Sequence, residues 1–286
     1  MLSTLSNFIA VAAARLTPFL TVAAAGGGHG EEGGKPHLPN FFSLLHDWGL
    51  LPDSIYHFTS EWINVIYGAF TAIIMSIFAM RVYARRKMIP EKAQNFLEML
   101  VESMYNFIYS ILGEDAKKYT PFLGTLFFYI LINNFWGIIP GGHSPSTSIN
   151  ITASLAIIVF LYAQYTGIRR LGIVGYLDHL AGQPRSAISW VLVIILFPIH
   201  VIGEFAKPFS LAVRLFGNIT GEDTLVAAFV MLGIASLAFI HLPVGLPLQV
   251  PFMLLGLLLS TIQALVFTIL STIYILLMLP HEEHAG

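Results

Sequence analysis

Long apolar runs dominate the chain and predict membrane-spanning helices. A helix needs about 20 mostly apolar residues to cross a bilayer core. Such runs occupy residues 62–80, 121–139, 151–168 and a longer region, 187–279, which the segment 241–247 interrupts. Counting the two arms of the last region separately, the pattern predicts an all-α integral membrane protein with about five transmembrane helices.

The last region is too long for an upright hairpin. Residues 187–240 would measure roughly 80 Å as one helix, and residues 249–279 roughly 46 Å. A bilayer core is only about 30 Å thick. Either the arms are steeply tilted, or the first arm is broken at Pro198 and Pro208. Both alternatives predict a long C-terminal hairpin, about 187–279, with a broad face inside the membrane.

Residues 91–118, between the first two runs, follow another pattern. Apolar residues recur there at helical spacing, with Glu98, Glu102 and Asn106 between them. This spacing predicts an amphipathic helix that lies along the membrane surface or packs under a partner, and not a further span.

The N-terminal 25 residues have the features of a secretory signal. Arg15 is their only charge, a short apolar run follows it, and residues 23–25 are small. We expect a cleaved signal peptide at 1–25, and an uncleaved apolar helix is the alternative. Residues 26–60 then form a polar segment outside the membrane, and residues 61–286 form the membrane domain.

Lysine and arginine residues predict the orientation. They follow the first and third apolar runs, whereas the sequence 140–150 has none. The basic residues are Arg81, Arg85, Arg86, Lys87, Lys92, Arg169, Arg170 and Arg185. Since basic loops face the cytoplasm, we expect the N-terminus outside and the C-terminus inside.

Composition supports a membrane protein and narrows its chemistry. Hydrophobic residues make up 56% of the chain and charged residues 10%, whereas soluble domains carry about 25% charged residues. The net charge of −2 argues against a nucleic-acid partner. The lack of cysteine excludes thiolate metal sites, and the sequence shows no nucleotide-binding glycine motif. We therefore expect no cofactor. The irregular spacing of His29, Glu31, Glu32, His37 and His46 argues against a metal site there.

Polar residues follow one face of the first hairpin arm. His200, Glu204, Lys207, Leu211, Arg214, Asn218 and Glu222 are three or four positions apart, and Asp223 follows the last. This step is close to one helical turn, so they share one face. The second arm repeats the spacing with Ser260, Gln263, Phe267, Ser271 and Tyr274. Polar and charged residues inside membrane helices are costly and mark functional sites.

Arg214 is the member of this stripe that is hardest to explain structurally. It lies near the middle of its arm, and no acidic residue stands three or four positions away. A guanidinium stays protonated, so the charge needs an anionic partner from elsewhere, such as another chain. Gln263, near the middle of the second arm, should lie at the same depth.

The other members have structural alternatives. Glu204 and Lys207 are three residues apart and could neutralise one another. His200 could be a buried histidine bonded to a backbone carbonyl. Asn218 and Gln263 could form interhelical hydrogen bonds, and the two serines of the second arm could serve close helix packing.

The run Lys-Pro-Phe-Ser-Leu-Ala-Val-Arg-Leu-Phe-Gly-Asn at 207–218 resembles the signature of subunit a of F-type ATP synthases. Residues 263–267 with Tyr274 resemble the last helix of that family. Asn133-Asn134 before residues 138–140, together with residues 145–152, resemble its middle helices. The resemblance covers roughly residues 60–284. It implies a hairpin that packs against a rotating ring of c subunits, each with one membrane carboxylate.

The resemblance also implies a role for each polar residue. Arg214 attracts the ionised ring carboxylate and blocks leakage between two aqueous half-channels. The outer half-channel is lined by Asn218, Glu222, Asp223 and Gln263, and Glu204 and His200 are the candidates for the inner one. Some relatives carry a histidine where this sequence has Gly256, and Glu222 would supply the titratable group here, as in the chloroplast-type pattern.

The resemblance implies a proton-channel subunit without catalytic activity of its own. We expect the translocated ion to be H⁺, with Na⁺ as an alternative. The expected partners are the c-ring, b-type peripheral stalk subunits and the rest of the synthase, and the expected location is a bacterial inner membrane. As a hypothesis, the helix at 91–118 meets the stalk.

Two other interpretations compete. A secondary transporter with a buried arginine for an anionic substrate predicts internal repeats, which the sequence lacks. A structural subunit of an electron-transfer complex predicts paired histidines within the spans, and only His200 lies well inside one.

Overall fold

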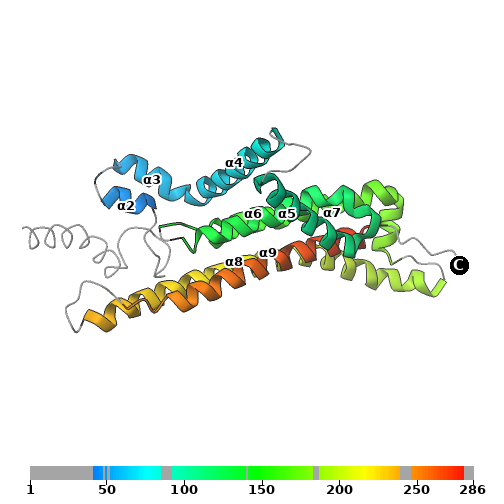
Figure 1. Cartoon of the computed structure of the whole chain (residues 1–286). Coiled ribbons are helices and arrows are strands. Elements are labelled where there is room, and N and C mark those ends of the chain that lie inside the picture. Colours follow the sequence, from blue (N-terminus) through cyan, green and yellow to red (C-terminus); the bar gives the residue numbers. More distant parts are fainter. Residues whose placement is uncertain are drawn as a thin grey trace, which may run out of the picture. The chain divides into compact units, whose positions relative to one another are not determined.

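The structure, a computed structural model, describes residues 41–47, 49, 52–84, 92–139, 141–182, 187–238 and 246–279. Every regular element among these residues is a helix (Figure 1), which confirms the all-α prediction. The predicted signal peptide and the basic residues Arg85, Arg86 and Lys87 lie outside the described residues.

The element order follows the apolar pattern closely. The helices are α2 (Phe41–Asp47), α3 (Asp53–Glu61), α4 (Ile63–Ala84), α5 (Lys92–Leu112), η1 (Gly113–Asp115), α6 (Ala116–Trp136), η2 (Pro145–Thr147), α7 (Ile149–Leu180), α8 (Ala187–Ala238) and α9 (Val250–Leu277).

Four described helices are long and apolar enough to cross a membrane. They are α4, α7 over Ile149–Asp178, α8 over Val193–Ser236, and α9. The expected span at 121–139 corresponds to α6, which is not among these four. Two asparagines near its end, Asn133 and Asn134, lower its hydropathy, and both are buried within the protein.

The chain forms two compact units. The first contains the described parts of Met1–Phe70 together with Ile132–Thr147 and Gly217–Thr261. The second contains those of Thr71–Leu131, Ser148–Phe216 and Ile262–Gly286. Helices α8 and α9 each contribute one part to each unit.

The amphipathic helix predicted at 91–118 is α5. Its residues Met104, Ile108 and Leu112 are buried in the second unit, whereas Phe96 and Met99 are more than half exposed. The helix ends where Gly113 adopts a φ of +61°, a left-handed conformation that favours glycine.

Helix α7 extends beyond the predicted run at 151–168 and contains a sharp break. Gly172 has φ +72° and ψ 168°, outside the helical region. Such a backbone is accessible to glycine because it has no Cβ. The break separates the apolar span from a short arm, residues 173–180, and determines where that arm lies.

Helix α8 continues through both of its prolines. It runs without interruption from Ala187 to Ala238, a length of 52 residues. The alternative of a break at Pro198 and Pro208 is therefore wrong. A helix of this length measures about 78 Å at 1.5 Å per residue. It exceeds the thickness of a bilayer core, and the steep tilt expected from the sequence stays a prediction.

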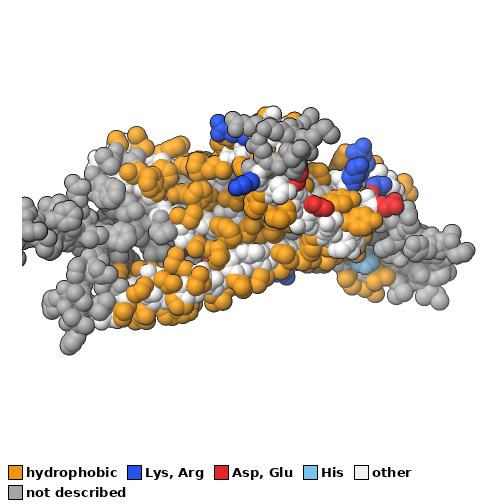
Figure 2. Space-filling view, viewed as in Figure 1, with side chains coloured by type: hydrophobic (Ala, Val, Ile, Leu, Met, Phe, Trp, Pro, Cys, Tyr) orange, Lys and Arg blue, Asp and Glu red, His pale blue; other side chains and the backbone are white. Residues whose placement is uncertain are grey.

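The described surface is largely apolar. Figure 2 shows one face, on which hydrophobic side chains cover most of the described area and charged side chains gather in a few places. Exposed residues include Ile194, Phe205 and Phe209 of α8 and Leu254 and Leu258 of α9. Such a surface suits hydrocarbon or partner helices better than water.

Candidate functional site

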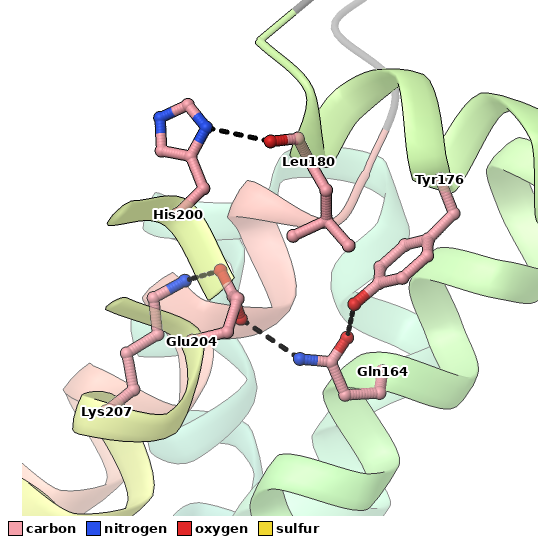
Figure 3. Close-up of polar contacts among 6 residues, drawn as sticks. All are labelled: Gln164, Tyr176, Leu180, His200, Glu204 and Lys207. Carbon is pink, nitrogen blue, oxygen red and sulfur yellow. Dashed lines mark hydrogen bonds and ion pairs between the residues drawn. The ribbon is translucent and has the colours of Figure 1, made fainter. Parts of the chain in front are cut away.

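A network of polar side chains joins α7 and α8 in the second unit (Figure 3). Glu204 and Lys207 form an ion pair, as their spacing of three residues allows. Gln164 of α7 donates from Nε2 to the other carboxylate oxygen of Glu204, at 3.0 Å. The hydroxyl of Tyr176 donates to the amide oxygen of Gln164. Glu204 is thus an acceptor on both oxygens, which suits its ionised form.

His200 joins the same region through the backbone. Its Nδ1 lies 2.9 Å from the carbonyl oxygen of Leu180, the last residue of α7 (Figure 3). A carbonyl oxygen only accepts, so Nδ1 carries a proton and donates it to this hydrogen bond. The structural alternative for His200, a buried histidine bonded to a carbonyl, is thus right about the bond and wrong about burial, because the side chain is exposed.

A small cavity adjoins this network. Its lining includes Glu204, Lys207, Leu211 and Tyr274. The ammonium of Lys207 lies 5.5 Å from the centre of the Tyr274 ring, a cation–π distance. The side chains of Lys207 and Glu204 are only 23% and 15% exposed, so this charge pair is largely shielded inside the unit.

Arg214 has different surroundings. Its side chain is exposed, whereas Leu211 and Leu215 on either side of it are buried. Within the described part of the chain, Arg214 forms no ion pair. The guanidinium is therefore available to an anion outside this chain.

Glu222 faces α9 in the first unit. Ser260 donates from Oγ to Oε2 of Glu222, at 3.2 Å. A Cβ built on Gly256 would lie 2.1 Å from Oε1 of the same carboxylate. Any side chain at position 256 would therefore displace the carboxylate, and the absence of one makes room for Glu222.

Glu222 and Asp223 line a polar cavity together with Asn134 and Ser144. The side-chain oxygens of Asn134 and Ser144 are buried and have no hydrogen-bond partner among the described residues. Ser146 and Thr220 of the same unit carry such oxygens as well. Buried polar atoms of this kind are ordinarily satisfied by water. The geometry thus describes a site suited to ordered water beside a carboxyl group.

The polar residues predicted to share one face of α8 lie in different environments in the structure. Glu204 and His200 belong to the network with α7, and Glu222 and Asp223 share the polar cavity. Asn218 is exposed, like Arg214, whereas Gln263 is buried on α9.

Sequence reasoning missed four residues. Gln164 is an amide side chain within an apolar span. It could have been found, because polar residues inside a membrane mark functional sites. Tyr176 lay beyond the predicted end of its span. Asn134 had only its resemblance to a family motif, and Ser144 gave no signal.

The described residues contain no group of three or more histidine and carboxylate side chains suited to a metal ion. Of the residues weighed for an N-terminal metal site, His46 instead bonds to Asp53, at 2.9 Å. The others lie in the part of the chain that the structure does not describe.

Comparison with known proteins identifies the family. The family model described as ATP synthase A chain matches residues 65–276. This chain belongs to that family. The ATP synthase subunit a of Protochlamydia amoebophila is 45% identical, over 87% of this chain and 91% of that protein. The ATP synthase subunit a of Moorella thermoacetica is 39% identical, over 72% of this chain and 86% of that protein.

Members of the ATP synthase subunit a family are non-catalytic membrane subunits of the rotary synthase. The predictions of a multi-pass membrane protein and of a subunit without enzymatic activity of its own are confirmed. Membership decides against the secondary-transporter and electron-transfer interpretations.

Proposed function

We propose that this chain exchanges protons with a rotating ring of c subunits, through two half-channels that Arg214 separates. One observation carries the proposal: Arg214 is an exposed, permanent cation on an apolar helix, and no acidic side chain of the described residues pairs with it. An ionised carboxylate on the neighbouring ring supplies the missing anion. A fixed cation favours the ionised carboxylate and lipid favours the protonated one, so each ring site releases a proton at Arg214.

The polar cavity of the first unit is the proposed outer half-channel. Glu222 and Asp223 supply carboxyl groups, and the buried oxygens of Asn134 and Ser144 supply positions for water. Asn218 and Gln263 are further proposed members of the outer half-channel. Water between fixed polar groups can pass a proton to a carboxylate that lies in the cavity wall.

The inner half-channel is proposed to open near His200 and Glu204. His200 is exposed, and the Nε2 atom of its neutral ring is suited to receive a proton. Glu204 holds its charge beside Lys207 and Gln164 and contributes the local field.

The central experiment replaces Arg214 with alanine in the assembled synthase. We expect ATP-driven proton uptake and gradient-driven ATP synthesis in sealed vesicles to be lost, while the soluble head still hydrolyses ATP. Arg81→Ala, an exposed cation in the last turn of α4, is the matched control and should leave both activities near the unmodified level. Normal coupling in an assembled Arg214→Ala complex would overturn the proposal.

Helix α5 is the proposed contact for the peripheral stalk. Its exposed apolar residues Phe96 and Met99 lie beside a polar face that carries Glu98 and Glu102. Exchanging the polar residues of that face among themselves should reduce crosslinking between the chain and the stalk. Unchanged crosslinking would argue against this contact.

The proposed orientation places the N-terminus outside and the C-terminus in the cytoplasm of a bacterial cell. It is supported by the basic residues that follow the first and third apolar runs. Because the chain has no cysteine, single cysteines at Ser54 and Arg169 can be labelled individually. An impermeant thiol reagent added to intact cells should modify the first and spare the second. The reverse pattern would invert the topology.

A further inference from the structure

Helix α8 carries two cationic side chains, one that is exposed and one that is ion-paired. Lys207 and Arg214 are its only lysine and arginine and are seven positions apart, so they lie on one face about 10 Å apart along the axis. Arg214 is exposed and forms no ion pair with a described residue. Lys207 is bonded to Glu204 and faces the ring of Tyr274. A second uncompensated cation at this spacing would compete with Arg214 for the same ring carboxylate.

The neutralisation of Lys207 depends on residues outside α8. Glu204 is oriented by the amide of Gln164, and Gln164 is in turn oriented by the hydroxyl of Tyr176 (Figure 3). Twelve residues separate Gln164 from Tyr176, which in a straight helix would place them about 18 Å apart. They meet because the chain turns at Gly172. A Cβ at Gly167 would lie 3.3 Å from the Tyr176 ring, so the arm packs closely on the span before it.

The arm makes a second attachment to α8. The Leu180 carbonyl at its end accepts from Nδ1 of His200. The arm at 173–180 therefore contacts α8 directly at His200 and reaches Glu204 through Gln164. These are the two residues of the proposed inner half-channel.

We propose that Gln164 and Tyr176 are positioning residues that keep the Glu204–Lys207 pair closed, so that Arg214 remains the single uncompensated cation on this face of α8. The inference rests on the proposed function of Arg214. An amide does not relay protons readily, so the contribution of Gln164 is to fix a charge and not to carry a proton.

The test is a mutant cycle in the assembled synthase, with ATP-driven proton uptake measured per ATP hydrolysed and per assembled complex. Gln164→Leu keeps the size of the side chain and removes the amide. We expect uptake to fall about fivefold to tenfold, which corresponds to the net contribution of a typical hydrogen bond. Tyr176→Phe removes a hydroxyl that bonds Gln164 and does not contact Glu204 itself, so it should lower uptake only about twofold to threefold. Tyr165→Phe, an exposed tyrosine of the same helix, is the matched control.

The same substitutions are then made in the double variant E204Q/K207Q. This variant lacks the ion pair that Gln164 and Tyr176 are proposed to position. A positioning role predicts that Gln164→Leu loses its effect there. An equal loss in both backgrounds would show that Gln164 acts elsewhere, and it would overturn the proposal.

Hydrogen exchange supplies a second measurement that needs no pumping. The amides of residues 173–180 should exchange faster in Gln164→Leu and Tyr176→Phe complexes, and not in Tyr165→Phe. Unchanged exchange in both would also overturn the proposal. The Arg214→Ala result separates the two hypotheses: if that variant pumps normally, the proposed function fails, whatever the cycle shows.

Discussion

Two glutamates of α8 occupy opposite kinds of environment. Both carboxylate oxygens of Glu204 have donors, one of them a cation and the other an amide. The carboxylate of Glu222 accepts from one neutral hydroxyl, that of Ser260, and lies in the wall of a cavity with Asp223. A neighbouring cation favours the ionised form of a carboxyl group, and a neutral hydroxyl donor supplies no such charge. Under the proposed function, Glu204 contributes a fixed charge and Glu222 exchanges protons.

The difference has a physical origin in the neighbouring helices. At Glu204, α7 brings an amide donor to a pair that α8 already forms with itself. At Glu222, the facing position of α9 is Gly256, which has no side chain and so leaves space for the carboxylate. The Glu204 site is enclosed by additional contacts from α7, whereas the Glu222 site has space because Gly256 of α9 has no side chain.

The largest expected effect tests the exchanging carboxyl. Glu222→Gln keeps the shape and removes the titratable group, so we expect coupled proton uptake to fall at least about a hundredfold, the low end of what a positioned acid–base group contributes. The control is Glu61→Gln, an exposed glutamate at the end of α3. The comparison would be broken if the charge-pair double variant E204Q/K207Q lost as much uptake as Glu222→Gln.

A smaller effect is expected from filling the space beside Glu222. Gly256→Ala places a methyl group 2.1 Å from the present position of Oε1, so the carboxylate must move and uptake should fall about threefold to fivefold. Shortening the acid in the same chain, by Glu222→Asp, should restore part of the loss. Gly124→Ala is the control, since its nearest contact would be an ordinary 3.5 Å. An additive loss in the double variant would argue against the steric explanation.

The smallest effect concerns the neutral donor. Ser260→Ala removes the hydroxyl bonded to Glu222 and should lower uptake about twofold, the low end of what a single hydrogen bond contributes. Ser271→Ala is the control, because that hydroxyl bonds the Phe267 carbonyl of its own helix, at 2.8 Å. Equal effects of the two serines would remove Ser260 from the proposed channel.

Comparing the predicted and observed helix boundaries shows which parts of the fold the local hydrophobic pattern predicts. The span predicted at 62–80 is α4, Ile63–Ala84, and the amphipathic helix predicted at 91–118 contains α5, Lys92–Leu112. These predictions succeed because hydrophobic periodicity is a local property. The prediction for α7 stopped at the two arginines, 169 and 170, because charge ends an apolar run. The helical arm beyond Gly172 is held by contacts with Gln164 and His200, which no window of sequence contains.

The sequence by itself determined the membrane class, the single polar face of α8 and the absence of a local partner for Arg214. Those features follow from composition and from a repeat near 3.6 residues, which are properties of neighbouring positions. The tertiary structure decided which polar residue is neutralised and which is left open. Gln164 reaches Glu204 across 40 residues, and Ser260 reaches Glu222 across 38. Their roles depend on helix packing because a hydrogen bond needs donor and acceptor within about 3 Å, whatever their distance along the chain.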